Sequence, residues 1–301
     1  MTAQGSIPAT PRTSDAGRTP PTLVVGATGR VGGRIARLLL SRGERVRILA
    51  RPGRNVDDLV AAGAEPVVGD LTDPGSLVIA CSGANAVIVT ANAARPAGSN
   101  TSTTVDDLGV GALVDAASRA GCGRFIHVSA DLARIDSPIE FLRAKAAAEL
   151  HVSRSGLAFT ILAPDMFMES WLPGVVLGPL EAGEPVLLVR GAPARAFVSE
   201  LDVAAIAVAT LDAPWTINGL LPVGGPDVVS WSEVVDGCAR IRGRAIDVTW
   251  LTRAEADALP NSRLAMLSLP GRTPPGSMRV TADRLGIRLA TVADFLADRC
   301  R

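Results

Sequence analysis

The first half of the chain alternates short, uninterrupted apolar runs with longer segments of helical periodicity. Six runs rich in Val, Ile and Leu predict strands at 22–26, 45–50, 65–69, 86–90, 124–129 and 157–162. The segments between them predict helices at about 30–42, 54–62, 74–81, 104–120 and 138–155. Strands that are apolar at nearly every position need cover on both faces of a sheet. The alternation therefore predicts an α/β fold, a Rossmann-type doubly wound parallel sheet.

After Pro164 the pattern is irregular, because Pro and Gly interrupt it. Short strands are predicted at 184–189, 196–198 and 246–251, and a short strand with a turn at 219–229. Helices are predicted at 200–212, 231–242, 253–258 and 291–299. Ser199 and Ser230 are the expected N-caps of the first two of these helices. We expect a main domain at 22–164 and a mixed segment at 165–301, which contributes a small substrate lobe and returns elements to the main domain.

Composition narrows the class of protein. The chain has 301 residues, 48% of them hydrophobic, with 30 basic and 30 acidic side chains. That length can bury a substantial core, and the zero net charge argues against a broad nucleic-acid or anionic-membrane surface. No apolar run reaches 18 residues, so no transmembrane helix is expected. Residues 1–21, rich in Thr, Pro, Ser, Ala and Gly, predict a disordered leader, and we expect a cytoplasmic protein.

The four cysteines are scattered along the chain, at positions 81, 122, 238 and 300. They form no CxxC pair and no Cys/His cluster, so neither a metal site nor a disulfide framework is expected.

The most informative motif lies between the first predicted strand and the first predicted helix. It reads Gly26-Ala-Thr28-Gly29-Arg30-Val31-Gly32. In a dinucleotide-binding turn, the first glycine permits the tight turn, the second lets backbone N–H groups approach the pyrophosphate, and the third lets the helix pack closely. The helix N-terminus then offers free N–H donors to the phosphates. We therefore assign Gly26 to Gly32 to cofactor binding.

The end of the second strand indicates which dinucleotide is bound. An NAD site usually carries Asp or Glu there, whereas an NADP site uses Arg for the 2′-phosphate. The strand ends in Arg51, the next carboxylate is Asp57, and Arg30 lies near the same corner. A guanidinium can bind the phosphate through two charge-assisted hydrogen bonds. The sequence therefore predicts NADPH/NADP+ as the cofactor.

Other strand ends supply further candidate residues. Asp70 and Leu71 follow the third strand and are candidates for the adenine, although Asp70 is equally consistent with a turn aspartate. Thr90 and Ala91 follow the fourth strand, where small residues would let the backbone approach a ribose, and Pro164 closes the sixth.

The histidines and serines of the chain argue against a hydrolase. His127 lies inside a predicted strand and is expected in the core, and His151 is expected at the surface. Ser129 lacks the Gly-x-Ser-x-Gly elbow of a Ser-His-Asp hydrolase.

Several motifs together resemble the short-chain dehydrogenase/reductase superfamily, in its extended or atypical NmrA-like branch. They are Gly26–Gly32, Gly69-Asp70-Leu71, Val128-Ser129, Lys145-Ala-Ala-Ala-Glu149 and Gly156–Pro164, within a match over about 22–250. That branch includes quinone reductases, benzylic ether reductases and redox-sensing regulators. The superfamily's catalytic Ser, Tyr and Lys map to Ser129, Phe141 and Lys145.

The departure at Phe141 changes the expected mechanism. The superfamily's Tyr protonates the substrate oxygen as hydride arrives, but Phe141 has no proton to give and the chain contains no tyrosine. Lys145, the sole lysine, can still hydrogen-bond the nicotinamide ribose and place a positive charge near the reacting centre. The proton is then expected from Ser129, from Asp131 if its pKa is raised, from a bound water, or from the substrate itself.

An apolar segment follows the sixth strand in a chain that is only 3% aromatic. Candidate walls of a flat pocket are Phe141, Met166, Phe167, Met168, Trp171 and Phe197, although lobe packing explains any one of them as well. We expect an NADPH-dependent ketoreductase of a polycyclic aromatic, polyketide-like or quinone compound, as in antibiotic biosynthesis. The alternatives are a non-enzymatic NADP(H) sensor, or an epimerase, dehydratase or ether reductase on the same scaffold.

Overall fold

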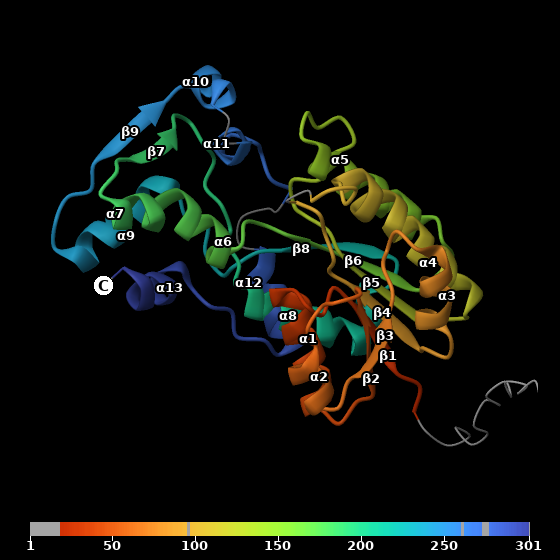
Figure 1. The fold of residues 1–301 in the computed structure, drawn as a ribbon. Coiled ribbons are helices and arrows are strands. Elements are labelled where there is room, and N and C mark those ends of the chain that lie inside the picture. The colour runs from red at the N-terminus through yellow and green to blue at the C-terminus, as the bar shows by residue number, and fades with distance from the viewer. Residues whose placement is uncertain (1–18, 95–96, 260–261, 273–276, 301) are drawn as a thin grey trace, which may run out of the picture.

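The fold is described from a computed structural model, which covers residues 19–94, 97–259, 262–272 and 277–300. Figure 1 shows a large sheet with helices on both faces and, to its left, a smaller lobe. The expected leader at 1–21 falls almost entirely outside the described residues. Within those residues, no helix has the length and apolar character needed to cross a membrane.

The main sheet has seven strands in the order β3-β2-β1-β4-β5-β6-β8, and every neighbouring pair is parallel. The strands are β1 Thr22–Val25, β2 Val46–Ala50, β3 Glu65–Val68, β4 Ala86–Val89, β5 Arg124–Val128, β6 Phe159–Pro164 and β8 Gly219–Val223. The order reverses between β1 and β4, which is the point where a doubly wound sheet binds its ligand. The predicted fold class is therefore confirmed.

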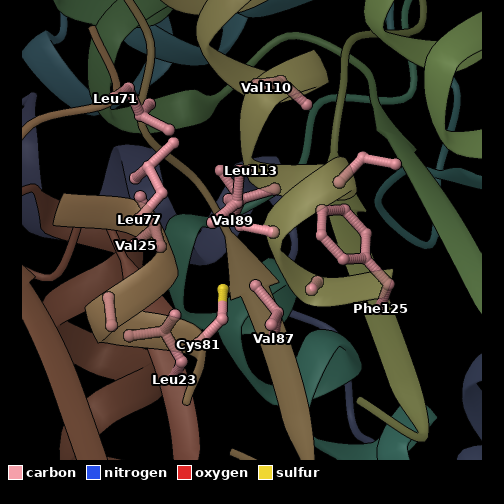
Figure 2. Packing of buried hydrophobic residues seen from close by; sticks show 14 of the residues in the cluster. Leu23, Val25, Leu71, Leu77, Cys81, Val87, Val89, Val110, Leu113 and Phe125 are labelled. Carbon is pink, nitrogen blue, oxygen red and sulfur yellow. The ribbon is translucent and has the colours of Figure 1, made fainter. Parts of the chain in front are cut away.

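Alternate residues of the central strands face two separate apolar cores. Leu23 and Val87 point into a core closed by α3 (Pro74–Cys81), α4 (Val110–Arg119) and α5 (Glu140–Ser153). Figure 2 shows side chains of β1, β4 and β5 meeting those of α3 and α4. Val24 and Ile88 point to the opposite face, which is covered by α1 (Arg30–Ser41), α2 (Asp57–Ala61) and α8 (Glu200–Ala209).

The segment after β6 divides between the lobe and the main domain. The lobe holds a second parallel sheet, β7 (Val186–Val189) with β9 (Val248–Leu251). Around it lie α6 Met168–Leu172, α7 Gly178–Ala182, α9 Trp231–Arg242, α10 Arg253–Ala258, α11 Ser262–Leu267 and α13 Val292–Arg299. Strand β8, helix α8 and α12 (Ser277–Leu285) return to the main domain. Ser199 and Ser230 cap α8 and α9 as expected.

Two predicted elements differ from the structure. The helix expected at 104–120 begins as a π-helix, η1 (Thr103–Gly109), and continues as α4. The strand expected at 196–198 is wrong, because only Val198 forms an isolated bridge, with Phe167. All three residues are buried, Phe197 in the lobe core and Val198 in the core of the main domain, and burial alone does not require a sheet. The short strand and turn predicted at 219–229 correspond to β8, which ends at Val223, and to the bend at 226–227 that follows it.

Several short elements had no prediction. They are α6, α7, α11, α12, the π-helix η2 Pro173–Leu177 and the 3₁₀ turn η4 Pro214–Thr216. They are too short, or too interrupted by Pro and Gly, to show a clear apolar periodicity. The helix predicted at 200–212 is α8 followed by a 3₁₀ turn, η3 Thr210–Asp212.

Candidate active site

A cavity of about 780 Å³ lies at the carboxyl ends of the main-sheet strands. Most of the residues expected at the site line it: Gly26, Thr28, Gly29, Arg30, Val31, Gly32, Arg51, Asp70, Leu71, Thr90, Ala91, Ser129, Asp131, Phe141, Lys145, Pro164, Met166, Phe167 and Trp171. Met168 and Phe197 do not. Both are fully buried in the lobe core, where Phe197 packs edge-to-face on Trp231 with ring centroids 4.9 Å apart. They pack in the same lobe core as Met166, which does line the cavity.

The glycine turn between β1 and α1 leaves room for a phosphate beside free backbone donors. Gly26 has φ +94°, and a Cβ added there would lie 2.6 Å from the Ala91 nitrogen. A Cβ on Gly32 would lie 2.3 Å from the Gly26 oxygen. Gly29 is the N-cap of α1, with no side-chain cap and no acidic residue in the first turn of the helix. The first N–H groups of α1 are thus available to an anion, and the turn fits a dinucleotide pyrophosphate.

Two arginines near this turn have different environments. Arg51 is exposed at the end of β2, and Arg54 also lines the cavity. Arg30 is already paired, because its Nη2 lies 2.9 Å from Oε1 of the buried Glu200. Burial raises the pKa of Glu200, and the Arg30 charge opposes that rise. Arg51 is therefore better placed than Arg30 to meet a 2′-phosphate.

Asp70 stabilises a turn and also faces the cavity. Its Oδ1 accepts hydrogen bonds from the backbone N and the Oγ1 of Thr72, each at 2.8 Å, so it stabilises a turn. It also lines the cavity beside Leu71.

Lys145 is buried between the sheet and η1. Its Nζ lies 3.0 Å from Oδ1 of Asp106 and donates to the carbonyl oxygen of Val128 at 3.1 Å. Oδ2 of Asp106 accepts from the backbone N of Ala93 at 2.7 Å, which connects the pair to the loop after β4. An ammonium has three N–H donors, so one remains for a molecule in the cavity. The ring of Phe141 lies 5.7 Å from Nζ.

Ser129 follows β5 and is engaged by a residue of α5. Its Oγ donates to Oε1 of Glu149 at 2.5 Å. Glu149 in turn receives two hydrogen bonds from Arg272, from Nη2 to Oε1 at 2.8 Å and from Nη1 to Oε2 at 3.1 Å. The Arg272 Nη2 also donates to the carbonyl oxygen of Ala130. The loop after α11 is therefore tied to the carboxyl end of β5.

A second charged cluster lies beside the first. Arg195 is fully buried and contacts Asp165 through Nε at 2.8 Å and through Nη2. Burial raises the pKa of Asp165, and the Arg195 charge opposes that rise. Asp131 accepts from the backbone N of Arg272 at 2.9 and 2.8 Å and lies 3.4 Å from Arg195 Nη2. Both Asp131 oxygens therefore accept hydrogen bonds from this chain.

The lobe end of the cavity is mainly apolar. Its walls include Ile139, Phe141, Leu142, Met166, Phe167, Trp171 and Met266. Arg263 from α11 lies over the Trp171 ring at 5.3 Å and donates to the carbonyl oxygen of Ser170 at 2.9 Å. Such walls suit a flat ring system.

Neither histidine belongs to the cavity lining. His127 is completely buried, and burial, with the nearby Lys145 charge, holds its pKa well below the ordinary value. His151 is exposed and lies 3.1 Å from Asp107. Within the described ranges, no three His, Cys, Asp or Glu side chains gather so as to hold a metal ion.

The sequence interpretation missed the residues that hold the predicted ones in place. Asp106, Glu149, Arg195, Glu200, Arg263 and Arg272 were not assigned to the site. Only Glu149 carried a local signal, since it lies four residues after Lys145 on one helix face. The others come from distant parts of the chain.

The fold and the cavity define a dinucleotide-binding Rossmann protein. Residues 26–214 match the model of a family described as NAD(P)H-binding. The chain belongs to this family, and its resemblance to the NmrA-like, atypical short-chain dehydrogenases is confirmed.

Known relatives differ in what they do. An NAD(P)H azoreductase of Xenophilus azovorans is 30% identical over 78% of each chain. The photosystem II assembly factor Ycf39 of Cyanophora paradoxa is 30% identical over 75% of this chain and 70% of its own. The solved structure of an NADPH-dependent quinone oxidoreductase from Escherichia coli, in complex with NADPH, superposes with a TM-score of 0.74 at 17% identity, covering 92% of this chain and 99% of its own.

Proposed function

We propose that the protein is an NADPH-dependent reductase of a carbonyl group on a hydrophobic, polycyclic aromatic, polyketide-like or quinone compound, and that it works without a catalytic tyrosine. One observation carries the proposal. A single cavity runs from the glycine turn, past Lys145, to the apolar wall of the lobe. It offers room for a dinucleotide and a ring system next to each other. The reductases among the relatives support the reaction class.

The residues present fit the cofactor. The N-terminus of α1 would hold the pyrophosphate, and Arg51 with Arg54 would hold the 2′-phosphate. The remaining donor of Lys145 would hold the nicotinamide ribose. The bound cofactor supplies the hydride.

The chain's own contribution is positioning and electrostatics. The positive charge of Lys145 favours the negative charge that develops on the carbonyl oxygen. Phe141 and Trp171 orient a ring and exclude water from it. Holding donor and acceptor in contact lowers the barrier by about 7–11 kcal/mol. A missing general acid costs about 10²- to 10⁴-fold in rate, which a substrate that carries its own acidic hydrogen would offset.

A panel of aromatic ketones and quinones tests the proposal. Purified protein should oxidise NADPH in the presence of at least one of them and yield the reduced compound. Lys145→Met should lower turnover, whereas Lys145→Met with no effect on an accepted substrate would contradict the placement of the site.

A non-enzymatic NADP(H)-binding regulator is the second candidate. It is favoured by the neutralisation of Lys145 by Asp106 and by the missing tyrosine. This alternative predicts equal affinities for NADPH and NADP+ and no reduction of any ketone or quinone in the panel.

A further inference from the structure

The Ser129 hydroxyl can donate one hydrogen bond, and it donates that bond to Glu149. A serine hydroxyl is one donor and two acceptors. The Oγ–Oε1 distance of 2.5 Å is typical of a strong hydrogen bond from a hydroxyl to a carboxylate. What Ser129 presents to the cavity is therefore a lone pair.

Arg272 fixes this arrangement. Its guanidinium meets both carboxylate oxygens of Glu149, and the Glu149 side chain is only 13% exposed. As a carboxylate, Glu149 can only accept, so it has no proton to return to Ser129. Arg272 is held by the carbonyl oxygens of Ala130 and Asp131 as well, which limits its freedom to leave the pair.

We infer that Ser129 recognises a hydroxyl donor on the substrate and does not donate to the reacting carbonyl. The inference rests on the proposed function and narrows its substrate class to hydroxylated aromatic ketones. A substrate hydroxyl facing Ser129 completes the chain of hydrogen bonds from ring to Ser129, Glu149 and Arg272. An ether or carbonyl oxygen at the same place meets a lone pair and is rejected. Glu149 and Arg272 act as positioning residues.

The experiment uses the full-length protein loaded with NADP+, so that no turnover is needed. The probes are the isomeric hydroxy-1-tetralones, each with its methyl ether, and calorimetry gives the dissociation constants. At least one hydroxy isomer should bind about tenfold more tightly than its ether. Ser129→Ala should weaken the binding of that hydroxy isomer and leave the binding of its ether unchanged. The ratio of the two dissociation constants should then be near one.

A second variant reverses the hydrogen bond without touching Ser129. Glu149→Leu frees the Ser129 proton for the cavity, so the ether should gain affinity relative to the phenol. Glu140→Gln, an exposed change on the same helix, is the control and should leave the ratio as in the parent protein. NADP+ affinity and circular dichroism show whether each variant is folded.

Three results would overturn the inference. The first is that every hydroxy isomer binds the parent protein no more tightly than its ether. The second is that Ser129→Ala loses affinity for phenol and ether equally, and the third is that no hydroxy isomer binds. The outcome is separable from the proposed function. Phenol selectivity without any reduction would refute the reductase and retain the role of Ser129, whereas equal reduction of phenols and ethers would do the opposite.

Discussion

Lys145 and Asp106 form a buried ion pair, with Nζ 3.0 Å from Oδ1 and side chains 2% and 0% exposed. Lys145 comes from α5 and Asp106 from η1, so the pair joins two elements that pack against each other below the cavity. It also fixes Ala93 in the loop after β4. The only lysine of the chain is thus held in one place by a dedicated partner.

Removing both members of this pair should cost less stability than the sum of the losses caused by removing each one alone. Lys145→Met or Asp106→Leu leaves a buried charge without its partner, which costs about 3–5 kcal/mol of unfolding free energy. The double variant leaves neither charge, so its loss should be smaller than the sum of the two. Urea unfolding of the four proteins measures the coupling. Additive losses would contradict a tight pair.

Restoring a phenol at position 141 should help a substrate that lacks its own proton. Phe141 lines the cavity with its ring 5.7 Å from Nζ of Lys145, and its resemblance to the superfamily motif predicts that it replaces the tyrosine. Phe141→Tyr should raise kcat for ketones without a neighbouring hydroxyl, up to about 10²-fold. Steady-state kinetics on a ketone and its hydroxylated analogue makes the comparison, and Phe295→Tyr, far along the chain in α13, is the control. If Phe141→Tyr changed kcat equally for both substrates, the supply of a proton would not be what separates their rates.

The glycine turn should tolerate a methyl group at one position and not at another. A Cβ on Gly32 would lie 2.3 Å from a backbone oxygen, whereas a Cβ on Gly29 would lie 3.2 Å from that same oxygen. Gly32→Ala must therefore shift α1 from β1, and we expect it to reduce NADPH affinity more than tenfold. Gly29→Ala requires a much smaller shift. Calorimetric titration with NADPH ranks the two variants, and a reversed order would contradict the geometry of the turn.

Cofactor preference should depend on Arg51. An exposed guanidinium at the end of β2 suits a phosphate, whereas a carboxylate there repels it. Arg51→Asp should lower NADPH affinity by about tenfold or more and bring NADH to comparable affinity. Arg119→Asp, in the last turn of α4, is the matched control. Unchanged NADPH binding in Arg51→Asp would place the 2′-phosphate elsewhere.

Asp202 should make stability depend on pH in a predictable direction. Burial raises the pKa of this α8 carboxyl above 3.8, although it accepts a hydrogen bond from Ala290. A raised folded-state pKa means that protonation favours the folded protein, so this contribution is present at low pH and is lost as pH rises through the raised pKa. Relative to Asp202→Asn, the parent protein should therefore lose stability as pH rises from the ordinary pKa of an aspartate through the raised pKa of Asp202. Thermal unfolding across that range measures the difference. The exposed Asp298→Asn should show no such trend.

Much of the main domain could be predicted from the sequence because its signals are local. Apolar runs such as Ala86–Val89 predict the strands, and Gly26, Gly29 and Gly32 predict the tight turn between β1 and α1. Ser199 and Ser230 cap helices through contacts three or fewer residues away. Each of these features depends on neighbours in the chain, which a pattern of residue types records.

The supporting charges of the site could not be predicted in the same way. Asp106 meets Lys145, and Arg272 meets Glu149, only because the chain folds back on itself. Met168 and Phe197 show the converse: being apolar and near the site in sequence does not decide whether a side chain faces the cavity or the core. The short helices of the lobe carry too few residues for a periodic signal.

The most direct test of the account follows the hydride itself. The protein is supplied with NADPH deuterated at C4 of the nicotinamide and with a hydroxylated aromatic ketone, and the product is analysed by mass spectrometry. The account predicts one deuterium atom at the new carbinol carbon, transferred from a single face of the nicotinamide. NADPH that binds tightly and yet delivers no deuterium to any ketone of the panel, and is oxidised by no quinone of the panel, would contradict it.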